Sequence, residues 1–137
     1  MWLLDRKKGR RFRAARETAL KKVREDWEAL SELPDHLRSD KEIIMAGVKQ
    51  CGVAFHSASD TLKVDRDFVM AVVKQRGWAL ACASDDLKAN KDVVMAAVKQ
   101  NAWALQFVSD DLKADKDFVM AAVKEYGQAL EYASNAL

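Results

Sequence analysis

The sequence predicts an all-α protein, an α-solenoid of stacked short helix pairs with a 25-residue period. The first observation is self-similarity, because residues 35–59, 60–84, 85–109 and 110–134 align with one another without a gap. The second is composition, since 50% of the 137 residues are apolar, 32% are charged and only Pro34 is a proline. Repeats of fixed length are typical of solenoids, in which each unit buries its apolar face against its neighbours.

Each repeat divides into a polar connector with one leucine, an N-cap, a first helix and a second helix. An N-cap side chain accepts hydrogen bonds from the free N–H groups of the first helical turn. The residues at this position are Asp40, Asp65, Asn90 and Asp115. In the third unit the first helix is expected over 91–100 and the second over 103–109. Gly52, Gly77 and Gly127 stand between the two helices and suit a left-handed C-terminal cap, although Ala102 occupies this position in the third unit.

The first helix of each unit has one apolar face, which we expect to form the core. At about 100° per residue, the apolar side chains fall within one arc. These are Ile43, Ile44, Gly47 and Val48, then Phe68, Val69, Val72 and Val73, then Val93, Val94, Ala97 and Val98. The recurring lysine (Lys49, Lys74, Lys99, Lys124) lies opposite, in water. The recurring methionine (Met45, Met70, Met95, Met120) flanks the arc, and packing between units is favoured there over an adaptable binding surface.

The segment before the regular repeats is basic and partly amphipathic. We expect a basic N-terminal arm over 1–9, and over 10–34 an amphipathic leading helix or degenerate capping repeat. An apolar stripe at steps of three and four residues predicts the helix from Arg10 to Leu33. The stripe consists of Phe12, Ala15, Ala19, Val23, Trp27 and Leu30. Pro34 then ends the helix, because the residue before a proline avoids helical geometry.

The last repeat is followed by the start of a fifth unit at Leu137. The final stacking face is therefore expected to be uncapped. Three explanations stay open: a partner covers this face, a second copy covers it through self-association, or the natural protein continues.

The repeat pattern D-[KR]-[DE]-x-V-M-A-A-V-K-Q-x-G-x-A-L-x-x-A-S-x-x-L resembles domain-of-unknown-function family 4116. The resemblance covers Asp35 to Leu137 in four units and leaves the segment from Met1 to Pro34 outside. It implies tandem short helices and, by analogy with other solenoids, a binding role. It supplies no catalytic residues.

We find no catalytic, metal or cofactor site and expect a protein that is not an enzyme. His36 and His56 lack the spacing to Cys51 and Cys82 that a zinc site requires. The Ser-Asp-Asp runs recur with the repeat, which favours capping roles over general acid–base catalysis. Two cysteines are too few for a disulfide framework, and no apolar run approaches the ~20 residues that span a bilayer. We expect an intracellular protein, cytoplasmic or organellar.

Positions that differ between repeats indicate what stacking leaves free. The residue after the glycine is Val53, Trp78, Trp103 or Gln128, and the glutamine indicates that the position is partly exposed. We predict that Trp78 and Trp103 stand side by side and anchor a protein partner. Edge packing of the solenoid is the alternative. Further variable positions complete the predicted partner-binding set with Arg76, Phe107, Tyr126 and Tyr132.

Positive charge is concentrated at the N-terminus. Residues 1–24 hold ten basic and two acidic side chains, a net charge of +8, whereas the rest of the chain holds 13 and 19, a net charge of −6. The basic-arm residues are Arg6, Lys7, Lys8, Arg10, Arg11 and Arg13. They suit docking on an acidic protein or larger assembly, which we prefer, or nucleic-acid phosphates, or an anionic membrane surface. The expected function is a non-catalytic interaction module or scaffold, with a nucleic-acid-associated factor as the alternative.

Overall fold

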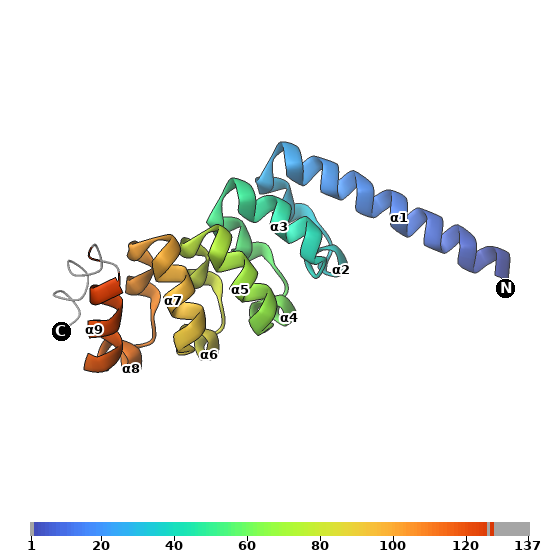
Figure 1. Cartoon of the computed structure of the whole chain (residues 1–137). Coiled ribbons are helices and arrows are strands. Elements are labelled where there is room, and N and C mark those ends of the chain that lie inside the picture. Colours follow the sequence, from blue (N-terminus) through green and yellow to red (C-terminus); the bar gives the residue numbers. More distant parts are fainter. Residues whose placement is uncertain (1, 126, 128–137) are drawn as a thin grey trace.

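A computed structural model describes residues 2–125 and 127, and over these residues all regular secondary structure is helical (Figure 1). α1 (Trp2–Glu25) is followed by the 3₁₀ helix η1 (Trp27–Glu32). A three-part unit then recurs, with a one-turn α-helix, a ten-residue α-helix and a six-residue 3₁₀ helix. This arrangement confirms the all-helical, solenoid-like repeat.

The elements of the unit keep the same lengths from one copy to the next. The one-turn helices are α2 (Asp35–Arg38), α4 (Asp60–Lys63), α6 (Asp85–Lys88) and α8 (Asp110–Lys113). The ten-residue helices are α3 (Lys41–Gln50), α5 (Arg66–Gln75), α7 (Lys91–Gln100) and α9 (Lys116–Glu125). The remaining 3₁₀ helices are η2 (Gly52–Ser57), η3 (Gly77–Cys82) and η4 (Ala102–Phe107). The ten-residue helices stack in one row along the solenoid (Figure 1).

The core lies where each ten-residue helix faces the 3₁₀ helices. The predicted arcs of α3, α5 and α7 are all buried, as are Ala54 and Phe55 from η2 and Ala79 and Leu80 from η3. The recurring leucine of each one-turn helix is buried beneath them. Met45, Met70 and Met95 are half-buried against this core, which confirms their packing role, whereas Met120 is exposed.

The connector and the second helix differ from the prediction in their geometry. The connector is a one-turn α-helix, and the second helix is 3₁₀, with Ala54 N donating to Cys51 O at 3.0 Å. The six residues of η2 lie between two extended residues, Cys51 and Ala58. A short segment of this kind closes readily with i→i+3 hydrogen bonds.

The glycines do not form left-handed caps, so that expectation is wrong. No glycine in the described part of the chain has a positive φ. Gly77 instead permits close approach between units, because a Cβ atom there would lie 2.5 Å from Ala97 O. The ten-residue helices end because the next residue is extended, as at Cys51, where φ is −154°.

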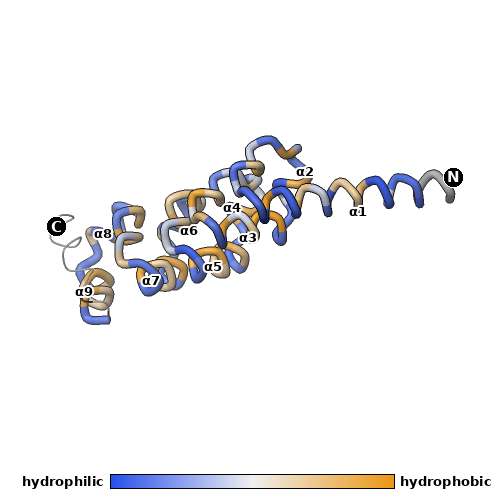
Figure 2. Tube along the Cα trace, turned by 90° about the horizontal axis from the view of Figure 1, so that it is seen from above, coloured by the Kyte–Doolittle hydropathy of each residue, from blue (hydrophilic) through white to orange (hydrophobic). Residues whose placement is uncertain are grey.

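The leading helix begins and ends earlier than expected. α1 is continuous from Trp2, so residues 2–9 are its first turns and not a separate arm. Asp26 is extended, and its side chain accepts a hydrogen bond from Glu28 N at 3.0 Å, which caps η1 as a new helix. Phe12 is 51% exposed because the N-terminal half of α1 projects past the repeats (Figure 1). Figure 2 shows that this projecting half is predominantly hydrophilic.

The rest of the predicted stripe divides by position along α1. Ala19, Val23 and Leu30 are buried and Trp27 is half-buried, as expected. Ala15 is exposed, like Phe12, because it precedes the part of α1 that packs on α3. The apolar stripe therefore covers the core only in its second half.

Periodic hydrogen bonds and ion pairs join successive units. At the start of the ten-residue helices, all four predicted N-caps accept hydrogen bonds from backbone N–H groups. Lys41 Nζ lies 3.1 Å from Asp65 Oδ2, and Lys91 Nζ lies 3.4 Å from Asp115 Oδ2. The N-cap acids therefore also join neighbouring layers. Equivalent backbone bonds at 3.0–3.1 Å link the one-turn helices, from Ser59 N to Arg38 O, from Ser84 N to Lys63 O and from Ser109 N to Lys88 O.

Candidate functional site

The 3₁₀ helices determine which side chains reach the surface. With three residues per turn, side chains at i and i+3 lie on the same side. In η4, Trp103 and Gln106 are exposed, Ala102 and Leu105 are buried, and Phe107 is half-buried. The equivalent positions Val53 and Trp78 are exposed as well, so this position is directed outward in each of the three units whose 3₁₀ helix the structure describes.

Apolar side chains of successive 3₁₀ helices lie next to one another along one strip of the surface. We call Val53, Trp78, Trp103 and Phe107 the aromatic edge. Val53, Trp78 and Trp103 are 55%, 41% and 53% exposed. The Trp78 and Trp103 rings stack with centroids 6.5 Å apart and an interplanar angle of 21°. Phe107 meets Trp78 edge to face at 5.1 Å.

The predicted side-by-side placement of the two tryptophans is therefore present, and the structure adds Phe107 as their common neighbour. Binding by this cluster stays a prediction. Tyr126 and Tyr132, also predicted for this surface, lie outside the described residues.

Backbone hydrogen bonds fix the orientation of the aromatic edge. Asn101 Oδ1 accepts from Trp103 N at 3.0 Å, and Gln106 Nε2 donates to Trp103 O at 3.1 Å. Gln100 of the same unit reaches the preceding one, where its Oε1 accepts from Gly77 N at 2.5 Å. Sequence reasoning missed the role of this glutamine, although its recurrence at Gln50, Gln75 and Gln100 was a visible signal.

A shallow pocket of about 300 Å³ adjoins the aromatic edge. Val53, Arg76, Trp78 and Gln100 are among the side chains that line it. Arg76 is exposed and donates from Nη2 to Lys49 O at 2.6 Å, so it closes the C-terminal end of α3. The predicted residue Arg76 is thus next to Trp78 and combines a structural hydrogen bond with an accessible guanidinium.

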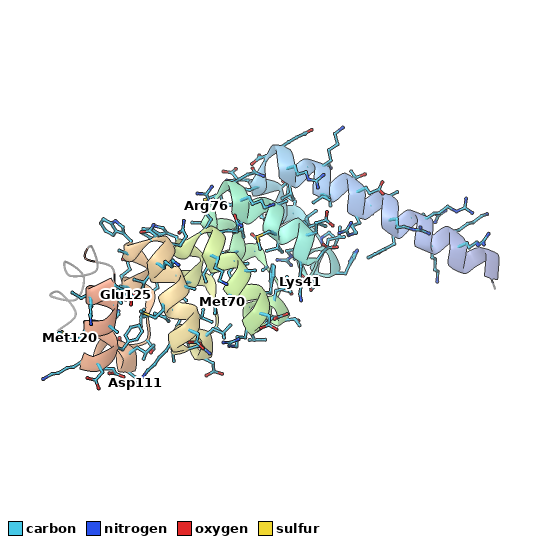
Figure 3. All side chains as sticks on the ribbon, viewed as in Figure 1. Lys41, Met70, Arg76, Asp111, Met120 and Glu125 are labelled. Atoms are coloured by element: carbon cyan, nitrogen blue, oxygen red, sulfur yellow. The ribbon has the colours of Figure 1, made fainter. Side chains whose placement is uncertain are left out.

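The opposite edge of the solenoid is charged. Figure 3 shows Lys41 and Asp111 at this edge and Arg76 at the other. Arg16 donates to Asp40 at 2.6 Å and to Glu42 at 2.5 Å, and these interactions raise the pKa of Arg16 further above its usual value. Partial burial favours the protonated form of Asp40, but its hydrogen bonds to Arg16 and to two backbone N–H groups outweigh this and lower its pKa. The charged side chains of this edge therefore join successive layers of the solenoid.

The basic-arm residues share one location. Arg6, Lys7, Lys8, Arg10, Arg11 and Arg13 are all exposed on the projecting half of α1. The aromatic edge belongs to the repeats and the cations belong to the leading helix. The two predicted binding sets are therefore separate surfaces.

The histidines and cysteines do not converge. His36 and His56 are exposed, and the His36 ring lies 5.7 Å from that of Phe12. Cys51 and Cys82 are half-buried free thiols, and burial raises the pKa of Cys82 against the opposing effect of Lys63 and Lys88. Among the described residues, no group of three or more His, Cys, Asp or Glu side chains is placed to hold a metal ion.

Comparison with known proteins identifies the repeat. The family described as "Domain of unknown function (DUF4116)" matches residues 16–63, 40–88, 65–113 and 90–137. The chain belongs to the DUF4116 family. Successive DUF4116 matches overlap, and each covers nearly two of the 25-residue repeats. Neither the curated proteins nor the solved structures contain a significant match to this chain.

The first DUF4116 match corrects the expected extent of the resemblance. It begins at residue 16, whereas the whole segment before Asp35 was expected to lie outside. The contacts agree with the match, because the Arg16–Asp40 pair is the counterpart, one repeat earlier, of the Lys41–Asp65 pair. The second half of α1 with η1 therefore corresponds to α3 with η2. No described helix is long and apolar enough to cross a bilayer.

Proposed function

We propose that this chain is a non-catalytic helical-repeat module that binds a protein partner through the aromatic edge. The observation that carries the proposal is the exposed Trp78–Trp103 stack with Phe107 beside it. Tryptophan is enriched among residues that dominate binding energies, and clustered aromatic side chains offer a large area at low entropic cost. A scaffold or assembly subunit fits this surface.

The variation between repeats supports the same proposal. The outward position of the 3₁₀ helix holds Val53, Trp78 and Trp103 in the three units whose 3₁₀ helix is described, and the aligned residue of the fourth repeat is Gln128. Folding therefore does not require an aromatic side chain there. An exposed aromatic cluster that folding does not require is costly in water, and such patches on soluble domains commonly mark binding sites.

The adjoining pocket adds polar groups to the apolar anchors. Arg76 and Gln100 line it together with Trp78. An interface with an aromatic centre and a polar rim resembles the usual anatomy of protein–protein contacts. We therefore expect the partner to place apolar side chains on the tryptophans and a hydrogen-bond acceptor near Arg76.

The test is retention of partners by the immobilised full chain. Wild type, Trp103→Gln and Val64→Gln are exposed to an extract of the cells that produce the protein, and retained proteins are quantified by mass spectrometry. Gln is the residue that the fourth repeat carries at this position, so the fold should tolerate it. Val64 is 61% exposed at the end of α4, away from the aromatic edge, and serves as the matched control.

We expect a specific set of proteins that Val64→Gln retains and Trp103→Gln loses at least tenfold. Equal retention by the two variants would show that the aromatic edge is not the binding surface.

A further inference from the structure

The projecting half of α1 is a helix with unusually dense positive charge. Residues 6–13 read RKKGRRFR, with six cations and no acid. All six are exposed, and the helix first contacts the repeats at Phe12, whose ring lies 5.7 Å from that of His36, and then at Arg16, which pairs with Asp40. Figure 1 shows this half extending beyond the stacked units.

The six cations surround most of the helix. At 100° per residue they span an arc of roughly 220°, more than half of the circumference. The remaining arc is the direction in which Ala19, Leu20 and Val23 are buried against the repeats. Lys7, Arg10 and Arg11 lie at the centre of the cationic arc, and Arg6, Lys8 and Arg13 lie at its two flanks.

This distribution discriminates between kinds of anionic partner. A membrane surface or an acidic protein face is nearly flat compared with the diameter of a helix, so it would contact only the cations at the centre of the arc. A groove with negative charge on both walls would also contact the cations at the two flanks of the arc. The major groove of B-form DNA is about 12 Å wide and admits an α-helix, which is about 10–12 Å across.

We propose that the projecting half of α1 binds double-stranded DNA in the major groove, with its flanking cations on the phosphates of both walls. The contacts of the flanking cations with phosphates carry no sequence information, so this part of the binding is independent of sequence. The proposal assigns the basic segment to nucleic acid, whereas its charge alone favoured docking on an acidic protein or larger assembly. The surface is distinct from the aromatic edge.

The experiment measures fluorescence anisotropy of a labelled 20-base-pair duplex against the full chain over a series of KCl concentrations. The central variant is Lys7→Gln, Arg10→Gln, Arg11→Gln, and the flank variant is Arg6→Gln, Lys8→Gln, Arg13→Gln. The control variant, Lys49→Gln, Lys74→Gln, Lys99→Gln, removes the same charge from exposed positions on the repeats. Circular dichroism confirms that each variant keeps its helix content, since Gln is a good helix former.

Wild type should bind with an affinity that falls steeply with salt. Each phosphate contact contributes about −0.9 to the slope of log K against log[salt], so the flank variant should reduce that slope by roughly 2–3. The central variant should also bind more weakly than wild type. The control and Trp103→Gln should bind like wild type.

Three results would overturn the proposal. A flank variant that binds like wild type indicates a flat partner. Equal binding to a single strand of the same length excludes the groove. Binding to vesicles of phosphatidylserine and phosphatidylcholine without binding to the duplex assigns the helix to a membrane surface.

Discussion

The Nζ atom of Lys41 lies 3.1 Å from Oδ2 of Asp65, while Oδ1 of the same carboxylate accepts a hydrogen bond from Phe68 N at 3.1 Å. One side chain therefore both caps a ten-residue helix and joins it to the preceding unit. The relationship recurs for Lys91, Asp115 and Phe118. Two requirements of the repeat, helix initiation and layer-to-layer register, are met at a single position.

In the third unit the capping residue is Asn90, which can cap the helix but cannot form an ion pair with the preceding unit. The Asn90 side chain accepts from Asp92 N at 3.1 Å and Val93 N at 3.2 Å but carries no charge. Asn90→Ala should lower the free energy of unfolding by about 1 kcal/mol, the usual cost of losing an N-cap. Asn90→Asp keeps the cap and should stay within about 0.5 kcal/mol of wild type. Urea denaturation measures the free energy of unfolding of both variants. An equal loss for Asn90→Ala and Asn90→Asp would show that the loss does not come from removing the cap.

The capping acids make stability depend on pH. Hydrogen bonds from Phe68 N and Lys41 lower the pKa of Asp65, and Phe118 N and Lys91 act in the same way on Asp115. A folded-state pKa below the unfolded value, about 3.9, means that the stabilisation is present above that value and is lost as the pH falls through the folded pKa. The melting temperature should therefore fall more steeply below about pH 4 than between pH 5 and 7.

The matched variant for this prediction replaces Asp40, Asp65 and Asp115 with Asn, the residue that the third repeat naturally carries at this position as Asn90. Its melting temperature should change less between pH 5 and pH 3 than that of wild type, because its caps do not titrate. Identical acid sensitivity of the two proteins would assign the pH dependence to other carboxylates.

Two glycines should respond in opposite directions to alanine. At Gly77 the new Cβ would lie 2.5 Å from Ala97 O, so Gly77→Ala should cost about 1–3 kcal/mol through overpacking. At Gly9 the nearest atom is Arg13 Nη2 at 4.0 Å, so Gly9→Ala should gain up to about 1 kcal/mol in helix propensity. Thermal unfolding of the two variants checks the signs, and stabilisation by both would show that units are not closely packed at Gly77.

The sequence was sufficient for the architecture because stacking constrains the same positions in every copy. The period located the units, and the 100° arc located Ile43, Ile44 and Val48 in the core. The 3₁₀ geometry of η2 was not predictable, because six residues between extended neighbours fit either helix type by pattern alone. The glycine at 77 was misinterpreted because its cause, the close approach of Ala97, comes from another unit.

The candidate site was predicted in part. Variation among repeats indicated Trp78, Trp103 and Phe107, and the structure brings these three together. The extent of α1 was not apparent, because charged residues at 6–13 interrupt the apolar pattern that marks a packed helix. A helical segment that projects from its domain does not need a continuous apolar face, so hydrophobic periodicity does not detect it.

The central claim is that the aromatic edge is not needed for folding, and the most direct measurement compares the unfolding free energies of Trp103→Gln and Leu105→Ala. These neighbours in η4 are 53% and 2% exposed. Leu105→Ala should cost about 2–5 kcal/mol, as expected for a fully buried leucine. Trp103→Gln should cost about 1 kcal/mol, the contribution of one aromatic pair. A loss for Trp103→Gln as large as that for Leu105→Ala would show that the tryptophans are packing residues of the solenoid, and would contradict this account.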